Sequence, residues 1–183
     1  MAKTERKTID QVFILLGIVA TAVLLVVGGL AWRAYAFATS SVKTELAAQQ
    51  IYFPATDSPA LAKLPDADKA AMTKYAGQQL LTGPQAKVYA NNFIAVHLSE
   101  VAAGKTYAQV STASLADPTN AQLKQQAQTL FQGETLRGLL LGDGYAYWTF
   151  GQIAQYAAVA ALAGAVLMAI LVLLGIRHRA NLK

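Results

Sequence analysis

The chain has 183 residues, of which 55% are hydrophobic and 14% are charged, a balance that is unusual for a water-soluble domain. Its formal charge is +5, but residues 33–148 hold nine basic and eight acidic side chains, so the excess lies in the tails and no surface for nucleic acid is predicted. The chain has no cysteine, which excludes disulfides, thiolate metal sites and thiol catalysis.

After a charged tail of residues 1–10, residues 11–32 form the first of two apolar blocks. These 22 residues carry no charge, and as a helix they would be about 33 Å long, which matches a hydrocarbon core of about 30 Å. The block therefore predicts a transmembrane helix. The alternative is a cleaved signal peptide, because Ala34-Tyr35-Ala36 resembles a cleavage site, but the apolar run is longer than the roughly 7 to 15 residues that such signals use.

The second apolar block covers residues 149–176 and is followed by a tail of residues 177–183. It predicts a second transmembrane helix, weaker in its alanine-rich first half. Small residues let a neighbouring helix approach closely in a membrane. We expect such a packing face, for the first span or for a partner's helix, at Ala157, Ala161, Gly164 and Ala165.

Basic and aromatic residues together predict the orientation of the two spans. The basic residues next to the blocks are Lys3, Arg6, Lys7, Arg177 and Arg179, which predicts that both termini are cytoplasmic. The aromatic residues at the other ends are Trp32, Tyr35, Tyr145, Tyr147 and Trp148, and such rings favour a membrane interface. We expect a multi-pass protein of a bacterial plasma membrane, with residues 33–148 on the extracytoplasmic side.

The central segment reads as helical throughout, because no convincing period-two strand occurs. We expect the first helix to continue to about residue 50, a loop over 53–59, helices over 66–81 and 84–103, a helix beginning at 117–118 with a break at Gly133, a piece over 134–141 and a turn at 142–144. The predicted fold class is all-α, with two transmembrane helices and a small extracytoplasmic helical bundle between them.

Histidine is the commonest general base and metal ligand, and this chain has two. His178 lies in the second tail and His97 in the central segment, so the expected topology separates them. Glu100 follows His97 by three residues, which places both on one helical face as half of a metal site or an acid/base pair. The more ordinary interpretation is a histidine at the edge of an apolar stripe.

Glu134 and Arg137 form the other polar feature in apolar surroundings. An ion pair between residues three apart is the ordinary interpretation, and contact with a lipid headgroup or a partner is the alternative. No phosphate-binding loop, dinucleotide fingerprint, nucleophile elbow or closely spaced set of metal ligands occurs, so no catalytic residue, cofactor or metal is predicted.

Several segments resemble a group of two-span membrane proteins of high-GC Gram-positive bacteria (actinobacteria) for which no activity is established. They include Tyr75-Ala-Gly-Gln-Gln, Phe93-Ile-Ala-Val-His-Leu, Gly104-Lys-Thr-Tyr, Gln128 through Leu141 and Trp148 through Ala154. The resemblance implies location and architecture only. Such sequences are sometimes labelled aromatic-ring-opening dioxygenases, but those enzymes hold iron with several His and carboxylate ligands, which two separated histidines do not supply.

The absence of catalytic groups beside packing surfaces favours a non-enzymatic accessory or scaffolding protein that binds another membrane protein or itself. An alternative from a different class is a sensor or carrier whose central domain encloses an apolar ligand such as a lipid, in a cavity near Tyr89, Phe93 and Phe131. A hydrolase or metalloenzyme using His97 and Glu100 is the least favoured reading.

Overall fold

Helices joined by short loops make up the part of the protein that the structure describes. The computed structural model describes residues 3–181, with side chains from Arg6 onward, so the side chains of Lys3, Glu5 and Lys183 lie outside the described residues. No strand occurs between residues 3 and 181, where the one isolated bridge joins Tyr52 to Gln79. The chain divides into two compact units: residues 1–37 with 150–183 (unit 1), and residues 38–149 (unit 2).

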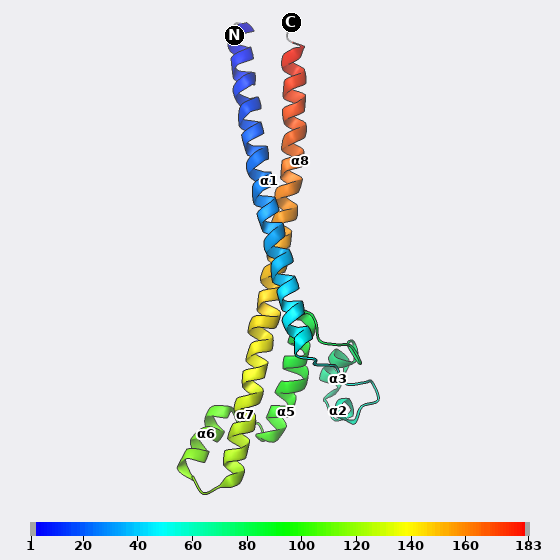
Figure 1. Ribbon diagram of the computed structural model, residues 1–183, viewed down its shortest axis with the longest axis vertical. Coiled ribbons are helices and arrows are strands. Elements are labelled where there is room, and N and C mark those ends of the chain that lie inside the picture. Colours follow the sequence, from blue (N-terminus) through cyan, green and yellow to red (C-terminus); the bar gives the residue numbers. More distant parts are fainter. Residues whose placement is uncertain (1–2, 182–183) are drawn as a thin grey trace. The chain divides into compact units, whose positions relative to one another are not determined.

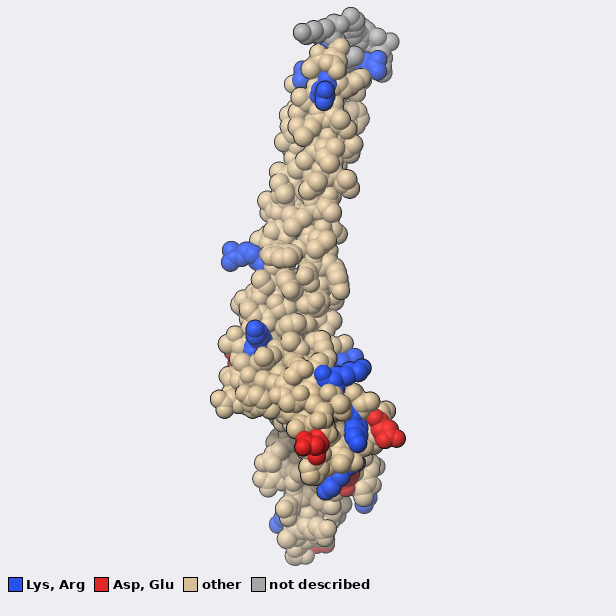
Figure 2. Space-filling view, turned by 90° about the vertical axis from the view of Figure 1, so that its right-hand side faces the viewer, with Lys and Arg blue, Asp and Glu red and all other residues tan. Residues whose placement is uncertain are grey.

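Unit 1 consists of one end of each of two long helices, α1 (Lys3–Ala48) and α8 (Tyr147–Ala180), which run side by side in opposite directions (Figure 1). Both are long and apolar enough to cross a membrane. Most of their large apolar side chains face outward, for example Leu30 at 64% and Leu173 at 65% exposure. Residues 11–32 and 150–176 of the pair carry no charge, and on the face that Figure 2 shows, Lys and Arg lie at its terminal end.

The two helices of unit 1 meet along a seam of small residues. On α8 the buried positions are Gly151, Ala158 and Ala165, spaced by seven residues as in a coiled coil. On α1, Gly17 faces Val172 and Gly28 faces Leu162. Of the packing face expected from the sequence, Ala165 is buried, Ala161 and Gly164 are half-buried, and Ala157 is exposed.

Contacts along the seam show which residues of α1 and α8 lie at the same height along the pair. The Arg179 guanidinium donates a hydrogen bond to the Gln11 side chain at 3.0 Å, and Gly28 faces Leu162. Four residues beyond Gly28, Trp32 therefore lies level with Ala158.

Unit 2 begins with the end of α1 and two short helices. The expected loop is present, and Ser58 caps α2 (Pro59–Ala62) by accepting a hydrogen bond from the Ala60 amide at 3.2 Å. The next helix, α3 (Asp66–Thr73), is shorter than the predicted 66–81. The chain then turns through Gly77, which has a φ of +72°, and returns beside residue 52 through the Tyr52–Gln79 bridge.

The middle of unit 2 is a nearly continuous helix, as predicted for 84–103. It consists of α4 (Gly83–Tyr89), a π-helical turn η1 (Ala90–Ile94) and α5 (Ala95–Val101). Thr82 and Gln85 form a capping box at its start. The buried Gln85 side chain accepts hydrogen bonds from the Leu81 and Thr82 amides at 2.9 and 3.0 Å, which satisfies the first turn without water.

In the next segment the structure differs from the prediction in three places. A helix that had not been predicted, α6 (Tyr107–Ala116), begins at a capping box of Thr106 and Gln109. The helix α7 (Ala121–Leu139) starts at the Asn120 cap and passes through Gly133 without a break. The expected turn at residues 142–144 is instead a π-helix, η2 (Leu140–Ala146), which continues into α8.

Close packing against other helices explains why these glycines do not end the helix. A Cβ at Gly133 would lie 2.4 Å from Leu98 Cδ2, and one at Gly144 would lie 3.0 Å from the Cβ of Ala86. Each glycine is therefore a contact point for a neighbouring helix. The buried core of unit 2 spans all of its helices: Val42, Leu46, Phe53, Leu61, Leu64, Met72, Leu80, Ala86, Ala90, Ile94, Leu98, Ala102, Val110, Leu130 and Leu140.

Two adjacent glycines test the seam of unit 1. A Cβ at Gly28 would lie 2.8 Å from both Cγ and Cδ2 of Leu162, whereas one at Gly29 would meet nothing within 4 Å. We expect Gly28→Ala to lower the free energy of unfolding by about 1–3 kcal/mol through overpacking, and Gly29→Ala to raise it by up to about 1 kcal/mol. Thermal unfolding of the two variants in one detergent, followed by circular dichroism, measures this difference. Equal midpoints would contradict the seam.

Candidate functional site

His97 and Glu100, the polar pair suggested by the sequence, do not form a joined site. Both side chains are exposed on α5, and His97 stacks on Phe93 with ring centroids 5.7 Å apart at 25°. Among the described residues no group of three or more His, Cys, Asp or Glu side chains is placed to hold a metal ion. His97 belongs to unit 2 and His178 to unit 1.

Glu134 and Arg137 do form the expected ion pair, with Arg137 Nη1 3.2 Å from Glu134 Oε2. The Arg137 guanidinium also donates to the Asn91 side chain at 3.3 Å, which links α7 to η1. Its Nε is buried and donates no hydrogen bond to the described residues. Arg137 is thus engaged within unit 2, and the exposed Glu134 carboxylate is the part that faces solvent.

Unit 2 has a groove between the end of α1 and η2. Its volume is about 410 Å³. We call it the α1–η2 groove. Its lining residues are Ser41, Val42, Glu45, Leu46, Gln49, Leu139, Leu140, Asp143, Gly144 and Tyr147.

The groove combines an apolar floor with an acidic rim. Leu46 and Leu140 are buried at its base, while Glu45 and Asp143 are exposed. No Lys or Arg is among the lining residues. Such a surface favours an apolar group that carries a positive charge, because the floor gains from burial and the rim from charge attraction.

The π-helix η2 supplies Leu140, Asp143 and Gly144 to the groove. Gly144 also lets η2 approach Ala86 of α4 closely. Sequence reasoning missed the groove because it placed a turn at 142–144. With a turn there, Asp143 would have no fixed relation to Glu45, whereas a continuous helix holds both at one site.

A contact between Lys87 and Tyr145 fastens η2 to α4. The Lys87 ammonium donates to the Tyr145 hydroxyl at 3.2 Å and lies 4.6 Å from the ring centroid. This hydrogen bond, followed by the charge of Lys87, lowers the pKa of Tyr145 from its ordinary value. Tyr145, expected from the sequence as an interface anchor, therefore also positions the π-helix that lines the groove.

No protein-family model matches this chain, and no curated protein or solved structure shows a significant similarity to it.

The Lys87–Tyr145 contact predicts a pH dependence. Because the pKa of Tyr145 is lowered, folding favours its ionised form, and this stabilisation is present above the unfolded pKa of about 10 and is lost as pH falls through the folded value. In the Lys87→Met variant we expect the pKa of Tyr145 to rise toward about 10. NMR titration of the labelled tyrosine carbon, assigned with Tyr145→Phe, measures it. Lys69→Met, on α3, is the control and should leave the pKa of Tyr145 unchanged.

Proposed function

We propose that this protein is a non-enzymatic accessory or scaffolding protein of a bacterial plasma membrane. In this proposal the α1–η2 groove of unit 2 receives an apolar helix, carrying a Lys or Arg, from another membrane protein. The observation that carries the proposal is the groove itself, with its buried Leu46 and Leu140 below and its exposed Glu45 and Asp143 at the rim.

Membrane attachment is supported by the two long apolar helices. The register of the seam suggests which parts lie in the bilayer. If residues 11–32 of α1 span it, the matching part of α8 is about residues 157–176, which are 20 uncharged residues and reach about 30 Å as a helix. Residues 149–156 include Gln152 and Gln155, which suit the aqueous boundary better than the hydrocarbon core.

We further propose that both termini are cytoplasmic and unit 2 is extracytoplasmic. Lys and Arg at the terminal end of unit 1 support this orientation under the positive-inside rule. Membership in the two-span group of actinobacterial membrane proteins stays part of the proposal. It would agree with a plasma-membrane location.

A partner helix with a basic residue fits the groove for a physical reason. The apolar floor alone would accept many occupants, but two carboxylates at its rim oppose an acidic one and attract a cation. Lys and Arg also carry long apolar stems, which would lie along Val42 and Leu139 while the charge reaches the rim.

The alternative, a carrier of an apolar ligand, is less well supported. Phe53, Tyr89 and Phe93 pack against one another, with centroids 5.4 Å apart for Phe53–Tyr89 and 5.1 Å for Tyr89–Phe93. Phe131 is 57% exposed and packs on Tyr107. The rings expected to surround a ligand are thus engaged with one another or with solvent.

Because the chain lacks cysteine, single-cysteine variants report its topology cleanly. We expect Thr56→Cys, in the exposed loop before α2, to react with a membrane-impermeant maleimide in intact cells. We expect Lys7→Cys to react only after permeabilisation, because the tails are proposed to be cytoplasmic. Gel-shift labelling measures both. The reverse pattern would place unit 2 in the cytosol and overturn the proposed orientation.

Site-specific photocrosslinking tests the docking groove. With p-benzoylphenylalanine at Gln49, on the groove wall, we expect one defined adduct with a membrane protein. At Lys74, exposed at the end of α3, we expect none. Mass spectrometry identifies the partner and the peptide attached.

A second set of variants tests whether the acidic rim of the groove contributes to binding. We expect the double variant Glu45→Gln with Asp143→Asn to reduce the Gln49 adduct about tenfold, since each exposed ion pair contributes up to about 1 kcal/mol. Asp57→Asn, an exposed acid outside the groove, is the matched control. An adduct of undiminished yield in the double variant, or one with a peptide that lacks Lys and Arg, would reject this docking mode.

A further inference from the structure

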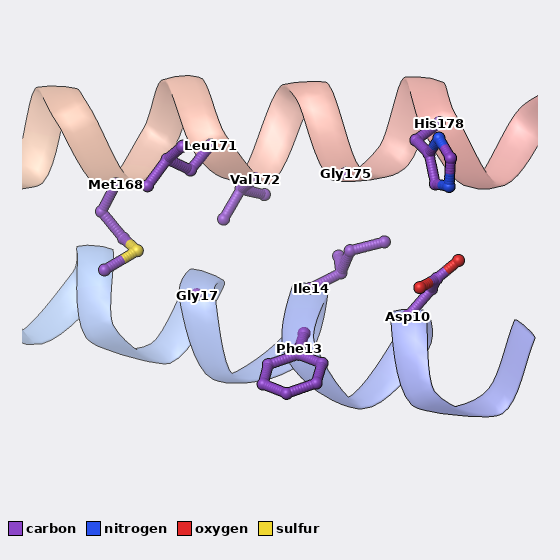
Figure 3. A pocket seen from close by; sticks show the side chains of 9 residues that line it. All are labelled: Asp10, Phe13, Ile14, Gly17, Met168, Leu171, Val172, Gly175 and His178. Atoms are coloured by element: carbon purple, nitrogen blue, oxygen red, sulfur yellow. The ribbon is translucent and has the colours of Figure 1, made fainter. Parts of the chain in front are cut away.

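Unit 1 has a cavity of its own, near the chain termini, between the first turns of α1 and the last turns of α8. Its volume is about 200 Å³. We call it the terminal cavity. Its lining residues are Asp10, Phe13, Ile14, Gly17, Met168, Leu171, Val172, Gly175 and His178 (Figure 3).

The terminal cavity is apolar along most of its length and polar at one end. Met168 and Val172 extend from α8 toward α1, whereas Gly17 and Gly175 add no side chain to either wall (Figure 3). At the end nearest the termini, Asp10 and His178 face each other from the two helices (Figure 3). This gradient from apolar to ionisable is the gradient of a bilayer leaflet.

The polar end contains a carboxylate that lacks a full set of hydrogen bonds. Asp10 Oδ2 is buried and accepts no hydrogen bond from the residues that the structure describes. A buried carboxylate oxygen without a donor is costly, and an N–H donor entering the cavity would remove that cost. One carboxylate and one imidazole are too few protein ligands for a dedicated divalent cation.

An imidazole and a guanidinium lie at the same end of unit 1 as this carboxylate. His178 is on the opposite wall, and Arg179 donates one hydrogen bond to Gln11 at 3.0 Å, which holds its guanidinium over α1. Arg179 also lines a neighbouring hollow with Ile14 and Ile176. A guanidinium has five N–H donors and is well suited to phosphate.

We propose that the terminal cavity binds a phospholipid whose headgroup carries a primary amine, such as phosphatidylethanolamine. The ammonium donates to Asp10, the phosphate lies beside Arg179 and His178, and part of one acyl chain follows Phe13, Met168 and Val172. The proposal rests on the membrane location proposed above and is independent of the α1–η2 groove.

Headgroup selectivity tests this assignment on the unaltered protein. The full-length chain in mild detergent is titrated with phosphatidylethanolamine, phosphatidylcholine and phosphatidylglycerol of identical acyl chains, and bound lipid is counted by native mass spectrometry. We expect phosphatidylethanolamine to bind at least about tenfold more tightly than phosphatidylcholine, because a quaternary ammonium has no N–H to donate to Asp10.

A variant of Asp10 tests the contribution of its carboxylate to this selectivity. Asp10→Asn keeps the shape and leaves only a neutral amide oxygen as acceptor, which binds an ammonium less strongly than a carboxylate does, and we expect most of the preference for the ethanolamine lipid over the choline lipid to be lost. Asp57→Asn, in unit 2, should keep the full selectivity. Circular dichroism checks that both variants retain their helices.

Two results would overturn the site. One is equal binding of ethanolamine and choline lipids to the unaltered chain. The other is tightest binding of phosphatidylglycerol, which would mean that Arg179 attracts an anionic lipid without help from Asp10. Either result would reject the lipid site. The proposed function would still stand if the cysteine variants label with the expected topology and the Gln49 adduct forms.

Discussion

Close approach of α1 and α8 along small residues is the constraint on which unit 1 depends. Two apolar helices in a bilayer gain little from hiding apolar surface, because the lipid is equally apolar, so contact has to come from tight packing. Gly28 meets Leu162 and Gly17 meets Val172 at distances that no larger residue permits. Large apolar side chains on the other faces, such as Leu30 and Leu173, are exposed, as is expected of two helices that are long and apolar enough to cross a membrane.

The same use of small residues continues in unit 2. Gly144 packs on Ala86, and Gly133 on Leu98. Both glycines lie within the helical run from Ala121 to Ala180. Glycine in the middle of a helix costs roughly 1 kcal/mol relative to alanine, and here that cost is offset by contacts that a side chain would block. The π-turns η1 and η2 occur in the helices that meet at these points.

Much of this fold could be predicted from the sequence because its signals are local. An uncharged block of 22 residues predicted the apolar part of α1, and the Thr82-Gly83-Pro84 start with a wide apolar stripe predicted the helix of α4, η1 and α5. The predicted breaks that the structure does not show fall at glycines that pack against residues far away in the sequence. Gly133 and the 142–144 segment were interpreted as breaks, but their meaning depends on Leu98 and Ala86, which lie far away in the sequence.

The sequence did not predict the candidate sites for a related reason. It did not show which face of the last helix each residue occupies. The buried positions Gly144, Gly151, Ala158 and Ala165 recur every seven residues, a period that was present in the sequence but becomes meaningful only if the helix does not turn at 142–144. Once η2 and α8 are read as one helix, the repeat fixes which face is covered.

Asp143 then falls beside Glu45 in one groove. His178, read as part of a charged tail, falls opposite Asp10 in the terminal cavity. Ionisable side chains that are far apart in the sequence are thus brought to the same groove or cavity by helix geometry.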